Sequence, residues 1–365
     1  MKIDLIAGAR PNFVKIAPII NAIHKAQNEG KDINYRLIHT GQHYDKNMSQ
    51  SFFEQLCIPK PDVNLGAGSG TQAEQTAAIM IGYEKLLLSS KTDLCLVVGD
   101  VTSTMACSIV AKKLNIPVAH VEAGIRSGDW TMPEEINRIV TDSISNYFFT
   151  TSLEAGDNLK KMGIADKFIH WVGNTMIDTL IVHRSRFQKP IIWNDLQLAK
   201  HSFIVMTLHR PANVDEEEKL KSLISEIIKY SHGLPLIFPV HPRTAKILQK
   251  LGIKHERLHT IDPLGYLEFN YLVENAKAVI TDSGGITEET TVMGVPCMTL
   301  RDNTERPETV SVGTNELIGT DPKAIKPAME KLFAGDWKKG TIPEMWDGKT
   351  AERIVSILTK IKNLV

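Results

Sequence analysis

The fold is decided by the stretch IDLIAGARPNFVKIAPIINAIHKAQ, residues 3–27, in which a short apolar run leads directly into a longer segment of helical period. Residues 3–9 are rich in apolar and β-branched side chains and predict a strand. In residues 12–27 the apolar positions recur every three to four residues, and Pro11 suits the first turn of a helix. A short apolar strand followed by a helix is typical of a parallel sheet that is covered on both faces.

The same alternation recurs along the 365 residues in two series. Further strands are predicted at residues 36–40, 94–98, 118–121, 203–208, 236–240, 259–261, 278–281 and 296–300, and helices at residues 216–230 and 267–275. Residues 184–201 contain Pro190 and have no clear period, which favours a linker. A chain of this length is also expected to hold about two domains.

We therefore predict an α/β fold of two Rossmann-like, doubly wound domains with a cleft between them. The first domain spans residues 1–183 and the second spans residues 202–350. Residues 351–365 are predicted to form a C-terminal helix, and the sequence leaves open whether it packs back on the first domain. Doubly wound sheets bind ligands beyond the carboxyl ends of their strands, so the residues just after each strand are the candidates for function.

The charge balance argues against several classes of partner. Lys and Arg number 42, as do Asp and Glu, so the formal net charge is zero. A nucleic acid is not expected as a partner, because its binding depends on a basic surface. No segment reaches the ~20 consecutive apolar residues of a membrane span, so no membrane association is expected either.

The cysteines and histidines do not have the spacing of a metal site. The four cysteines are scattered and form no C-x-x-C pair, and none of the twelve histidines belongs to an H-E-x-x-H motif. We therefore expect no catalytic metal. Scattered thiols in apolar runs are typical of a reducing compartment, which predicts a cytoplasmic protein.

The strongest motif is Thr281-Asp282-Ser283-Gly284-Gly285-Ile286-Thr287-Glu288-Glu289, which follows a predicted strand and opens a helix. Ser283, Gly284 and Gly285 let backbone N–H groups approach an anion, and the positive end of the helix dipole favours its charge. A carboxylate close behind such a turn suits the two hydroxyl donors of a ribose. The alternative is a tight strand-to-helix turn without a ligand.

Two cations stand at the start of the first helix. Arg10 ends the first strand run, and Lys15 lies in the first turns of the helix that follows. Cations at this end oppose the helix dipole, so a pair of solvated side chains is less favoured than a pair that binds phosphate oxygens.

Carboxylates follow two predicted strands of the first domain. Asp100 comes after residues 94–98, Glu122 comes directly after residues 118–121, and Glu134 follows soon after. An acid directly after a buried strand is unfavourable unless it is hydrogen-bonded or functional. Three such acids suit proton removal and delivery at a reacting carbon. The alternative for each acid alone is a place in the first turn of a helix.

Two histidines and an arginine follow strands of the second domain. His209 and His241 end two strand runs at the side that faces the predicted cleft. Two histidines at equivalent positions favour a role at a diphosphate or leaving group. Arg306 follows residues 296–300 and is expected to hold phosphate or ribose, with a surface ion-pair network as the alternative.

These motifs resemble those of the non-hydrolysing UDP-N-acetylglucosamine 2-epimerases over nearly the whole chain. The segments that carry the resemblance are Gly8-Ala9-Arg10-Pro11, Gly99-Asp100, His120-Val121-Glu122-Ala123-Gly124, Pro133-Glu134-Glu135-Ile136-Asn137-Arg138, Val172-Gly173-Asn174-Thr175, His209-Arg210, Asp282-Ser283-Gly284-Gly285 and Arg301-Asp302-Asn303-Thr304-Glu305-Arg306-Pro307-Glu308. The family fold is the two-domain glycosyltransferase-B arrangement, which agrees with the two domains predicted above.

The resemblance implies reversible inversion at C2 of UDP-GlcNAc to give UDP-ManNAc, without a metal, nicotinamide or other cofactor. UDP is eliminated to leave 2-acetamidoglucal and adds back with protonation on the other face. By resemblance, the catalytic residues are Asp100, Glu122, Glu134 and His209. The residues that would hold UDP are Arg10, Lys15, His241, Phe269, Ser283, Gly284, Gly285, Glu289 and Arg306. We also expect a homodimer.

The sequence departs from the family pattern in places. Ala9 and Asn12 replace the commoner Thr and Glu, and Pro211-Ala212-Asn213 replaces a segment that usually carries Glu. Gln42-His43 resembles a bacterial segment tied to activation by a second UDP-GlcNAc, although residues 44–48 differ from it.

Three other functions compete with this reading. A sister branch of the family, which shares Gly8-Ala9-Arg10 and Gly41-Gln42-His43, epimerises UDP-2,3-diacetamido-glucuronate. A glycosyltransferase of the same fold would need an acceptor site and explains poorly the three acids of the first domain. A catalytically silent UDP-sugar sensor is the third alternative, motivated by the altered segment after Arg210.

Overall fold

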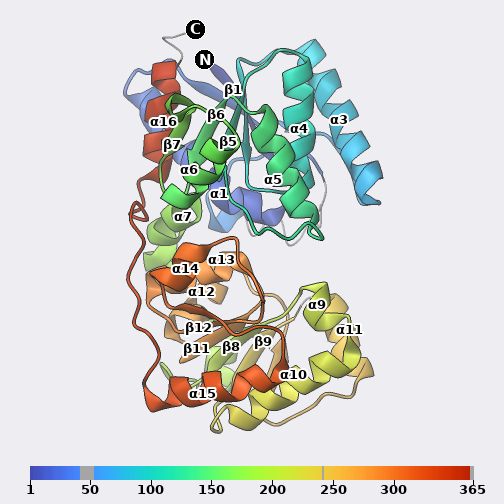
Figure 1. Ribbon diagram of the computed structural model, residues 1–365, viewed down its shortest axis with the longest axis vertical. Helices are drawn as coiled ribbons and strands as arrows, with labels where there is room; N and C mark the ends of the chain where they lie inside the picture. Colours follow the sequence, from blue (N-terminus) through green and yellow to red (C-terminus); the bar gives the residue numbers. More distant parts are fainter. Residues whose placement is uncertain (42–52, 241, 362–365) are drawn as a thin grey trace. The chain divides into compact units, whose positions relative to one another are not determined.

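The computed structural model describes residues 1–41, 53–240 and 242–361, and leaves out the side chains of residues 10, 211, 212, 242 and 243. The chain forms two compact units, Met1–Val182 with Glu344–Val365 (unit 1) and His183–Pro343 (unit 2) (Figure 1). Each unit is a parallel sheet with helices packed on it, so the predicted class of two Rossmann-like, doubly wound α/β domains is confirmed. Among the described residues, no helix is long and apolar enough to cross a membrane.

In the described part of unit 1, seven parallel strands form one sheet in the order β3-β2-β1-β4-β5-β6-β7. The strands are β1 (Lys2–Ala7), β2 (Asn34–His39), β3 (Val63–Asn64), β4 (Leu94–Val98), β5 (Val118–Val121), β6 (Tyr147–Thr150) and β7 (Ile169–Trp171). The direction in which strands are added reverses between β1 and β4, which is the usual ligand position in such sheets.

The helices of unit 1 are α1 (Arg10–Asn28), α3 (Gln72–Ser89), α4 (Thr102–Lys113), α5 (Pro133–Ile144), α6 (Leu153–Lys161), α7 (Thr175–His183) and α16 (Thr350–Ile361), with a 3₁₀ turn at Asp166–Phe168. All of β4 is buried, which requires cover on both faces. Cys95 and Val97 of β4 pack on one face against α3 and α4, and Leu96 points to the opposite face.

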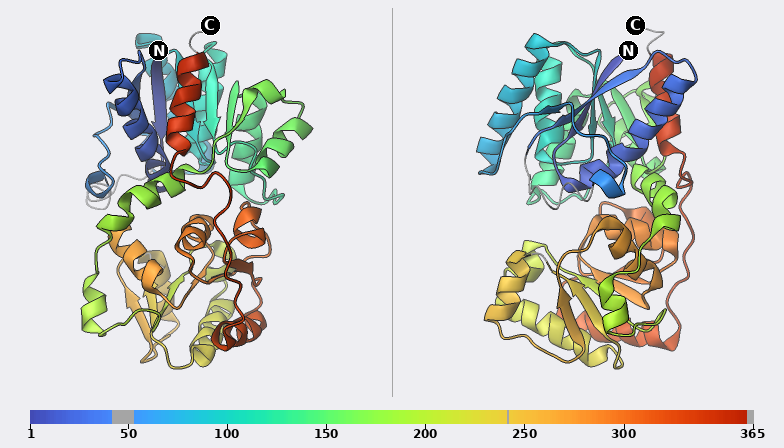
Figure 2. Two further views of the ribbon diagram at one scale, coloured as in Figure 1. Left: turned by 90° about the vertical axis from the view of Figure 1, so that its left-hand side faces the viewer. Right: turned by 180° about the vertical axis from the view of Figure 1, so that it is seen from behind.

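The C-terminal helix α16 belongs to unit 1 and lies beside α1, as the left view of Figure 2 shows. Its N-terminus is held by Asp178 of α7, which accepts the N–H groups of Thr350 (3.1 Å) and Ala351 (2.7 Å). Burial raises the pKa of the Asp178 carboxyl to about 6, although these donors oppose the rise. Residues at the end of the chain therefore complete the unit that the N-terminus begins.

In the described part of unit 2, six parallel strands follow the order β10-β9-β8-β11-β12-β13. The strands are β8 (Ile204–Thr207), β9 (Leu236–Pro239), β10 (Leu258–Ile261), β11 (Ala278–Thr281), β12 (Cys297–Thr299) and β13 (Asn315–Leu317). The reversal here falls between β8 and β11. Both units thus repeat the doubly wound order of a Rossmann sheet.

The helices of unit 2 are α8 (Ile191–Asp195), α9 (Pro211–Val214), α10 (Glu217–Tyr230), α11 (Pro242–Lys250), α12 (Tyr266–Asn275), α13 (Gly284–Met293), α14 (Pro307–Ser311) and α15 (Ile325–Ala334), with 3₁₀ turns at Arg184–Arg186 and Pro322–Ala324. Alternate strand residues face two different apolar clusters. Ile204 and Met206 pack with α10 and α15, whereas Phe203 and Val205 pack with α12 and Trp193. The sheet is therefore covered on both faces.

The boundaries of the two units differ from those of the predicted domains at both places where the chain passes from one unit to the other. Residues 184–201, predicted as a linker, belong to unit 2, because Trp193 of α8 is buried against Phe203 and Tyr271. Residues 344–350 belong to unit 1, where Gly173 lies against the backbone of Met345.

Candidate functional site

The candidate residues of unit 1 gather where β1, β4 and β5 end. In a parallel sheet the carboxyl ends of neighbouring strands share one edge, so the segments after these strands meet. Lys15 Nζ of α1 lies 2.6 Å from Oε2 of Glu122, which follows β5. Both side chains are largely buried, with exposed fractions of 12% and 3%. Lys15, which we expected at the diphosphate, is thus paired with a candidate catalytic carboxylate.

Gly99 and Asn12 frame this ion pair. Gly99 has φ 71°, and a Cβ at this position would stand 3.2 Å from Lys15 Nζ and 3.6 Å from Glu122 Oε2. Asn12 accepts the N–H groups of Gly8 (3.3 Å) and Ala9 (3.0 Å) and donates to the carbonyl of Val98 (2.8 Å). The amide of Asn12 therefore ties the end of β1 to the end of β4.

Glu122 itself has an unusual backbone. Its φ is 69°, a left-handed conformation that is uncommon for residues with a side chain and costs free energy. The conformation is held because the N–H groups of Glu122 (2.9 Å) and Ala123 (3.1 Å) both donate to the carbonyl of Phe149 on β6. The strand end thus directs the Glu122 carboxylate toward Lys15.

Asp100, just after β4, is held by the first turns of α5. Nε (3.0 Å) and Nη2 (2.6 Å) of Arg138 both donate to Asp100 Oδ2, and Asn137 donates to the Asp100 carbonyl (2.8 Å). The Asp100 side chain keeps 30% of its surface exposed, against 4% for Arg138. The carboxylate is therefore both fixed and accessible.

Glu134 and Glu135 are neighbours with different surroundings. Glu135 is buried, pairs with Arg138 (2.7 Å) and accepts the N–H groups of Ser127 and Gly128. Burial alone would raise the pKa of Glu135, but these donors hold it below its usual value. This is a structural role, as expected for an acid in a first helical turn. Glu134 is half-buried in the first turn of α5.

In unit 2, His209 after β8 and Asp282 after β11 form an ion pair. His209 Nδ1 lies 2.7 Å from Asp282 Oδ1, and the N–H groups of His209 and Arg210 also donate to this carboxylate. Burial alone would raise the pKa of Asp282, but donors from His209 and Arg210 hold it below its usual value. With Nδ1–H donated to an ionised Asp282, Nε2 is the nitrogen that can exchange a proton with a substrate. The His209 side chain is 55% exposed, which permits that exchange.

The predicted anion-binding turn is present next to this pair. Ser283 is the N-cap of α13, and Gly284 and Gly285 form its first turn, with N–H groups that have no helical acceptor. A Cβ on Gly284 would stand 2.6 Å from Glu305 Oε1, so the turn has no room for a side chain. Glu305 is in turn held by Arg301 (2.6 Å).

Glu289 and Arg306, which we expected to bind the ribose and a phosphate, both have protein partners in unit 2. Glu289 is buried, and burial raises its pKa to about 7, although hydrogen bonds with Tyr266 and Asn270 oppose the rise. Arg306 Nε lies 2.5 Å from Oε1 of the buried Glu288. The predicted phosphate clamp is thus already in an ion pair. Phe269 is half-buried on α12.

Some predicted residues cannot be placed. His241 and the segment Gln42-His43 lie outside the described residues, and Arg10 begins α1 with a side chain that is not described. Sequence reasoning missed the partners Asn12, Arg138 and Asp282 as functional candidates. Asp282 directly precedes the candidate Ser283, Asn12 lies between the candidates Arg10 and Lys15, and Arg138 lies four residues after Glu134, and this proximity was the available signal.

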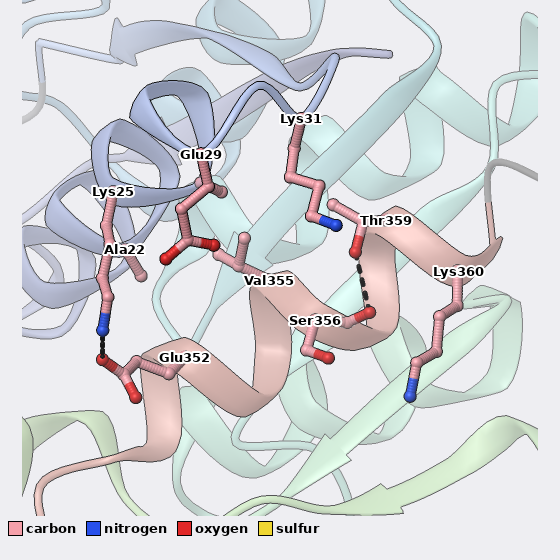
Figure 3. A pocket seen from close by; sticks show the side chains of 10 residues that line it. Ala22, Lys25, Glu29, Lys31, Glu352, Val355, Ser356, Thr359 and Lys360 are labelled. Atoms are coloured by element: carbon pink, nitrogen blue, oxygen red, sulfur yellow. Dashed lines mark hydrogen bonds and ion pairs between the residues drawn. The ribbon is translucent and has the colours of Figure 1, made fainter.

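A pocket of about 390 Å³ lies elsewhere on unit 1, between α1 and α16 (Figure 3). Its lining includes the ion pair Lys25–Glu352 (2.6 Å), in which both side chains are more than half exposed. Ala22 and Lys25 lie roughly two turns or more along α1 from Lys15. Of the predicted site residues whose side chains the structure describes, none lines this pocket.

Comparison with known proteins gives matches over almost the whole chain. Residues 25–359 match the sequence profile of the family described as UDP-N-acetylglucosamine 2-epimerase. A UDP-N-acetylglucosamine 2-epimerase of Methanocaldococcus jannaschii is 42% identical over 379 residues, covering 98% of this chain and 99% of that protein. A UDP-2,3-diacetamido-2,3-dideoxy-D-glucuronate 2-epimerase of Pseudomonas aeruginosa is 41% identical over 323 residues, covering 87% and 88%.

A solved structure matches as well. The crystal structure of the Methanocaldococcus jannaschii UDP-GlcNAc 2-epimerase in complex with UDP-GlcNAc and UDP has a TM-score of 0.88 to this chain at 42% identity. The match covers 99% of this chain and 100% of that one.

Proposed function

The chain belongs to the UDP-N-acetylglucosamine 2-epimerase family, and on this premise we propose that it interconverts UDP-GlcNAc and UDP-ManNAc by inversion at C2. The observation that carries the proposal is the pair of cation-held carboxylates, Asp100 and Glu122, at adjacent strand ends of unit 1. A glycosyltransferase has no need of two such groups, whereas proton exchange at carbon needs an acid and a base.

The proposed reaction balances without a redox partner. A base removes the C2 proton, the C1–O bond breaks, UDP departs with the bonding electrons, and a C1=C2 double bond forms. In the return step UDP attacks C1 and an acid delivers a proton to the other face of C2. The intermediate is 2-acetamidoglucal, and no atom changes its net oxidation state over the cycle.

We assign the proton transfers to Asp100, Glu122 and Glu134. The C2 proton is weakly acidic, so its removal needs bases that are fixed close to the carbon. Arg138 fixes Asp100, and Lys15 fixes Glu122 in one orientation.

We assign UDP to unit 2. The N–H groups of Gly284 and Gly285 suit the diphosphate, as does the hydroxyl of Ser283, whose own N–H donates to Thr281 Oγ1 (3.0 Å), and His209, oriented by Asp282, suits protonation of the departing phosphate. Glu289 suits the ribose hydroxyls, which can donate to its carboxylate. The remaining candidates for UDP are Arg10, His241, Phe269 at the uracil and Arg306, which would have to exchange Glu288 for the ligand.

A related UDP-sugar is the second candidate substrate. The Pseudomonas aeruginosa relative acts, by its name, on UDP-2,3-diacetamido-2,3-dideoxy-D-glucuronate and is nearly as similar to this chain as the Methanocaldococcus jannaschii enzyme. That sugar carries the same C2 chemistry with a carboxylate at C6. The two substrates therefore differ at C6 and also at C3, next to the reacting carbon, where an acetamido group replaces the hydroxyl.

The test is an equilibrium assay with both sugars. Purified protein is incubated with UDP-GlcNAc or with UDP-2,3-diacetamido-glucuronate, and the epimers are followed by proton NMR. We expect UDP-ManNAc from UDP-GlcNAc, and loss of product with Asp100→Asn and Glu122→Gln while UDP still binds. Turnover of the diacetamido sugar alone would move the protein to the sister branch, and turnover of neither would refute the proposal.

We also propose that the protein acts as a homodimer in the cytoplasm. The oligomeric state is tested by light scattering coupled to size-exclusion chromatography, where a mass near twice 40.6 kDa is expected. A monomer at the concentration of the activity assay would contradict the dimer.

A further inference from the structure

A buried histidine outside the assigned catalytic set links the two main carboxylates. His120, on β5, has no exposed surface. Its Nε2 lies 2.9 Å from the carbonyl of Gly99, and its Nδ1 lies 2.7 Å from Oδ1 of Asp142 on α5. Gly99 immediately precedes Asp100, and His120 stands two residues before Glu122.

The partners of this ring determine its protons. A carbonyl oxygen carries no hydrogen, so Nε2 must donate to Gly99. Oδ2 of Asp142 also accepts from Arg126 (2.7 Å) and from the Gly124 N–H (3.1 Å). Burial would raise the pKa of Asp142, but His120 and Arg126 hold it below its usual value. The ring is therefore held at both nitrogens, and its Nε2–H is committed to Gly99.

The hydrogen bond from His120 orients the Gly99 carbonyl, in a turn where the Gly99 N–H already donates to the carbonyl of Val121 on β5 (3.0 Å) and Asn137 donates to the Asp100 carbonyl (2.8 Å). The Gly99 carbonyl belongs to the peptide plane that joins Gly99 to Asp100, so its orientation sets the position of the Asp100 backbone. Gly99 lacks a Cβ and adopts φ 71°, and glycine can populate many other conformations. A donor fixed on β5 removes this freedom.

We propose that His120 is a positioning residue: through its buried Nε2–H it clamps the Gly99–Asp100 peptide to β5, which Glu122 directly follows, and so sets the two carboxylates in register for proton exchange at C2. The inference rests on the proposed function. Asp142 holds the ring in place and is itself paired with Arg126, whereas the hydrogen bond to the Gly99 carbonyl comes from His120. The clamp therefore depends on the Nε2–H donor.

Two isosteric variants separate the clamp from simple packing. In His120→Gln the side-chain amide can take the place of Nε2 and still donate to Gly99. In His120→Asn the amide takes the place of Nδ1 and keeps Asp142 but cannot reach Gly99. Both variants lose the ring, so a purely structural role predicts similar losses of activity and of Tm.

We expect kcat for epimerisation to fall about a hundredfold in His120→Asn and about tenfold or less in His120→Gln, with KM and the Kd for UDP within about threefold of wild type. Equal losses in the two variants, or a larger loss in His120→Gln, would overturn the clamp. Unchanged UDP binding in wild-type protein that turns over no UDP-sugar would instead refute the proposed function.

A second measurement stands if the variants do not fold. In wild-type protein labelled with ¹⁵N-histidine, the ring of His120 should show a proton on Nε2 that is protected from solvent exchange, because the side chain has no exposed surface and this proton is donated to Gly99. His39→Gln and His183→Gln identify the signals of two other buried rings. A spectrum without a further protected Nε2–H contradicts the clamp.

Discussion

At the scale of the residue, adjacent glutamates on α13 have opposite effects on stability. Glu289 is buried, and its pKa is raised to about 7 from 4.5. The folded protein therefore binds this proton more tightly than the unfolded chain, and stability is lost as the pH rises from about 4.5 to about 7. Glu288, by contrast, is buried in an ion pair with Arg306.

We predict that Glu289→Gln stabilises the protein at about pH 8 by up to about 3 kcal/mol, because it removes the cost of ionising a buried acid. At about pH 5 the gain should be much smaller, since folded wild-type protein keeps the proton there. Urea unfolding at the two pH values measures the difference. The matched control is Glu288→Gln, which leaves the Arg306 charge uncompensated and should destabilise by about 3 kcal/mol. A gain from Glu289→Gln that is equal at both pH values would contradict the assignment.

The pair His209–Asp282 gives a prediction for activity. Asp282→Asn cannot accept Nδ1–H as a carboxylate does, so His209 loses the tautomer and orientation that expose Nε2. We expect kcat/KM to fall about a hundredfold or more, and adding His209→Gln to this variant should cost little further activity. Steady-state kinetics of the single and double variants measure this. Additive losses would show that the two side chains act separately.

The position of a single residue was predictable from the sequence where a strand end decides it. Asp100 and Glu122 follow strands, and strand ends are where doubly wound sheets bind ligands. The partner of each residue was not predictable, because it depends on distances across the sheet. Lys15 was assigned to phosphate from its place at a helix start, yet its ammonium reaches Glu122 from a helix that is 107 residues distant in the chain.

At the scale of the element, the turn after β4 requires glycine for two reasons. Gly99 needs its positive φ and the space that a Cβ would take from Lys15. We predict that Gly99→Ala lowers kcat/KM about tenfold or more, because the Lys15–Glu122 pair must shift. Gly30→Ala is the matched control, since Gly30 has φ 80° with nothing near its Cβ. Both variants should lose about 1 kcal/mol of stability, and only the first should lose activity. Equal activity in the two variants would show that the space beside Gly99 is not needed to position the Lys15–Glu122 pair.

The elements that were predicted well are those with several consecutive apolar residues. The strands at residues 94–98, 118–121 and 278–281 coincide with β4, β5 and β11. The two-residue strand β3 and the edge strand β13 carry too little pattern to be recognised, because pairing with a neighbour defines them. The helix α8 is too short to show a clear helical period in the sequence. It is recognised as part of unit 2 only from the burial of Trp193.

At the scale of the whole molecule, α16 makes the two ends of the chain parts of one unit. Ile354 of α16 has no exposed surface, and Leu332 of α15 is its counterpart in unit 2. We predict that Ile354→Ala destabilises unit 1 by about 3 kcal/mol. Protection from hydrogen exchange should therefore weaken in residues 1–182 but not in residues 183–343. Leu332→Ala should do the reverse. Loss of protection in both units from either change would contradict two separately stable units.

The central claim is that this protein exchanges the C2 proton of UDP-GlcNAc during reversible loss of UDP. The most direct measurement is incubation of the purified protein with UDP-GlcNAc in D₂O, with NMR of the recovered sugars. The account predicts deuterium at C2 of both UDP-GlcNAc and UDP-ManNAc, and none with Asp100→Asn or Glu122→Gln. Epimerised sugar that keeps its original proton, or sugar that remains unlabelled and unepimerised after prolonged incubation, would contradict it.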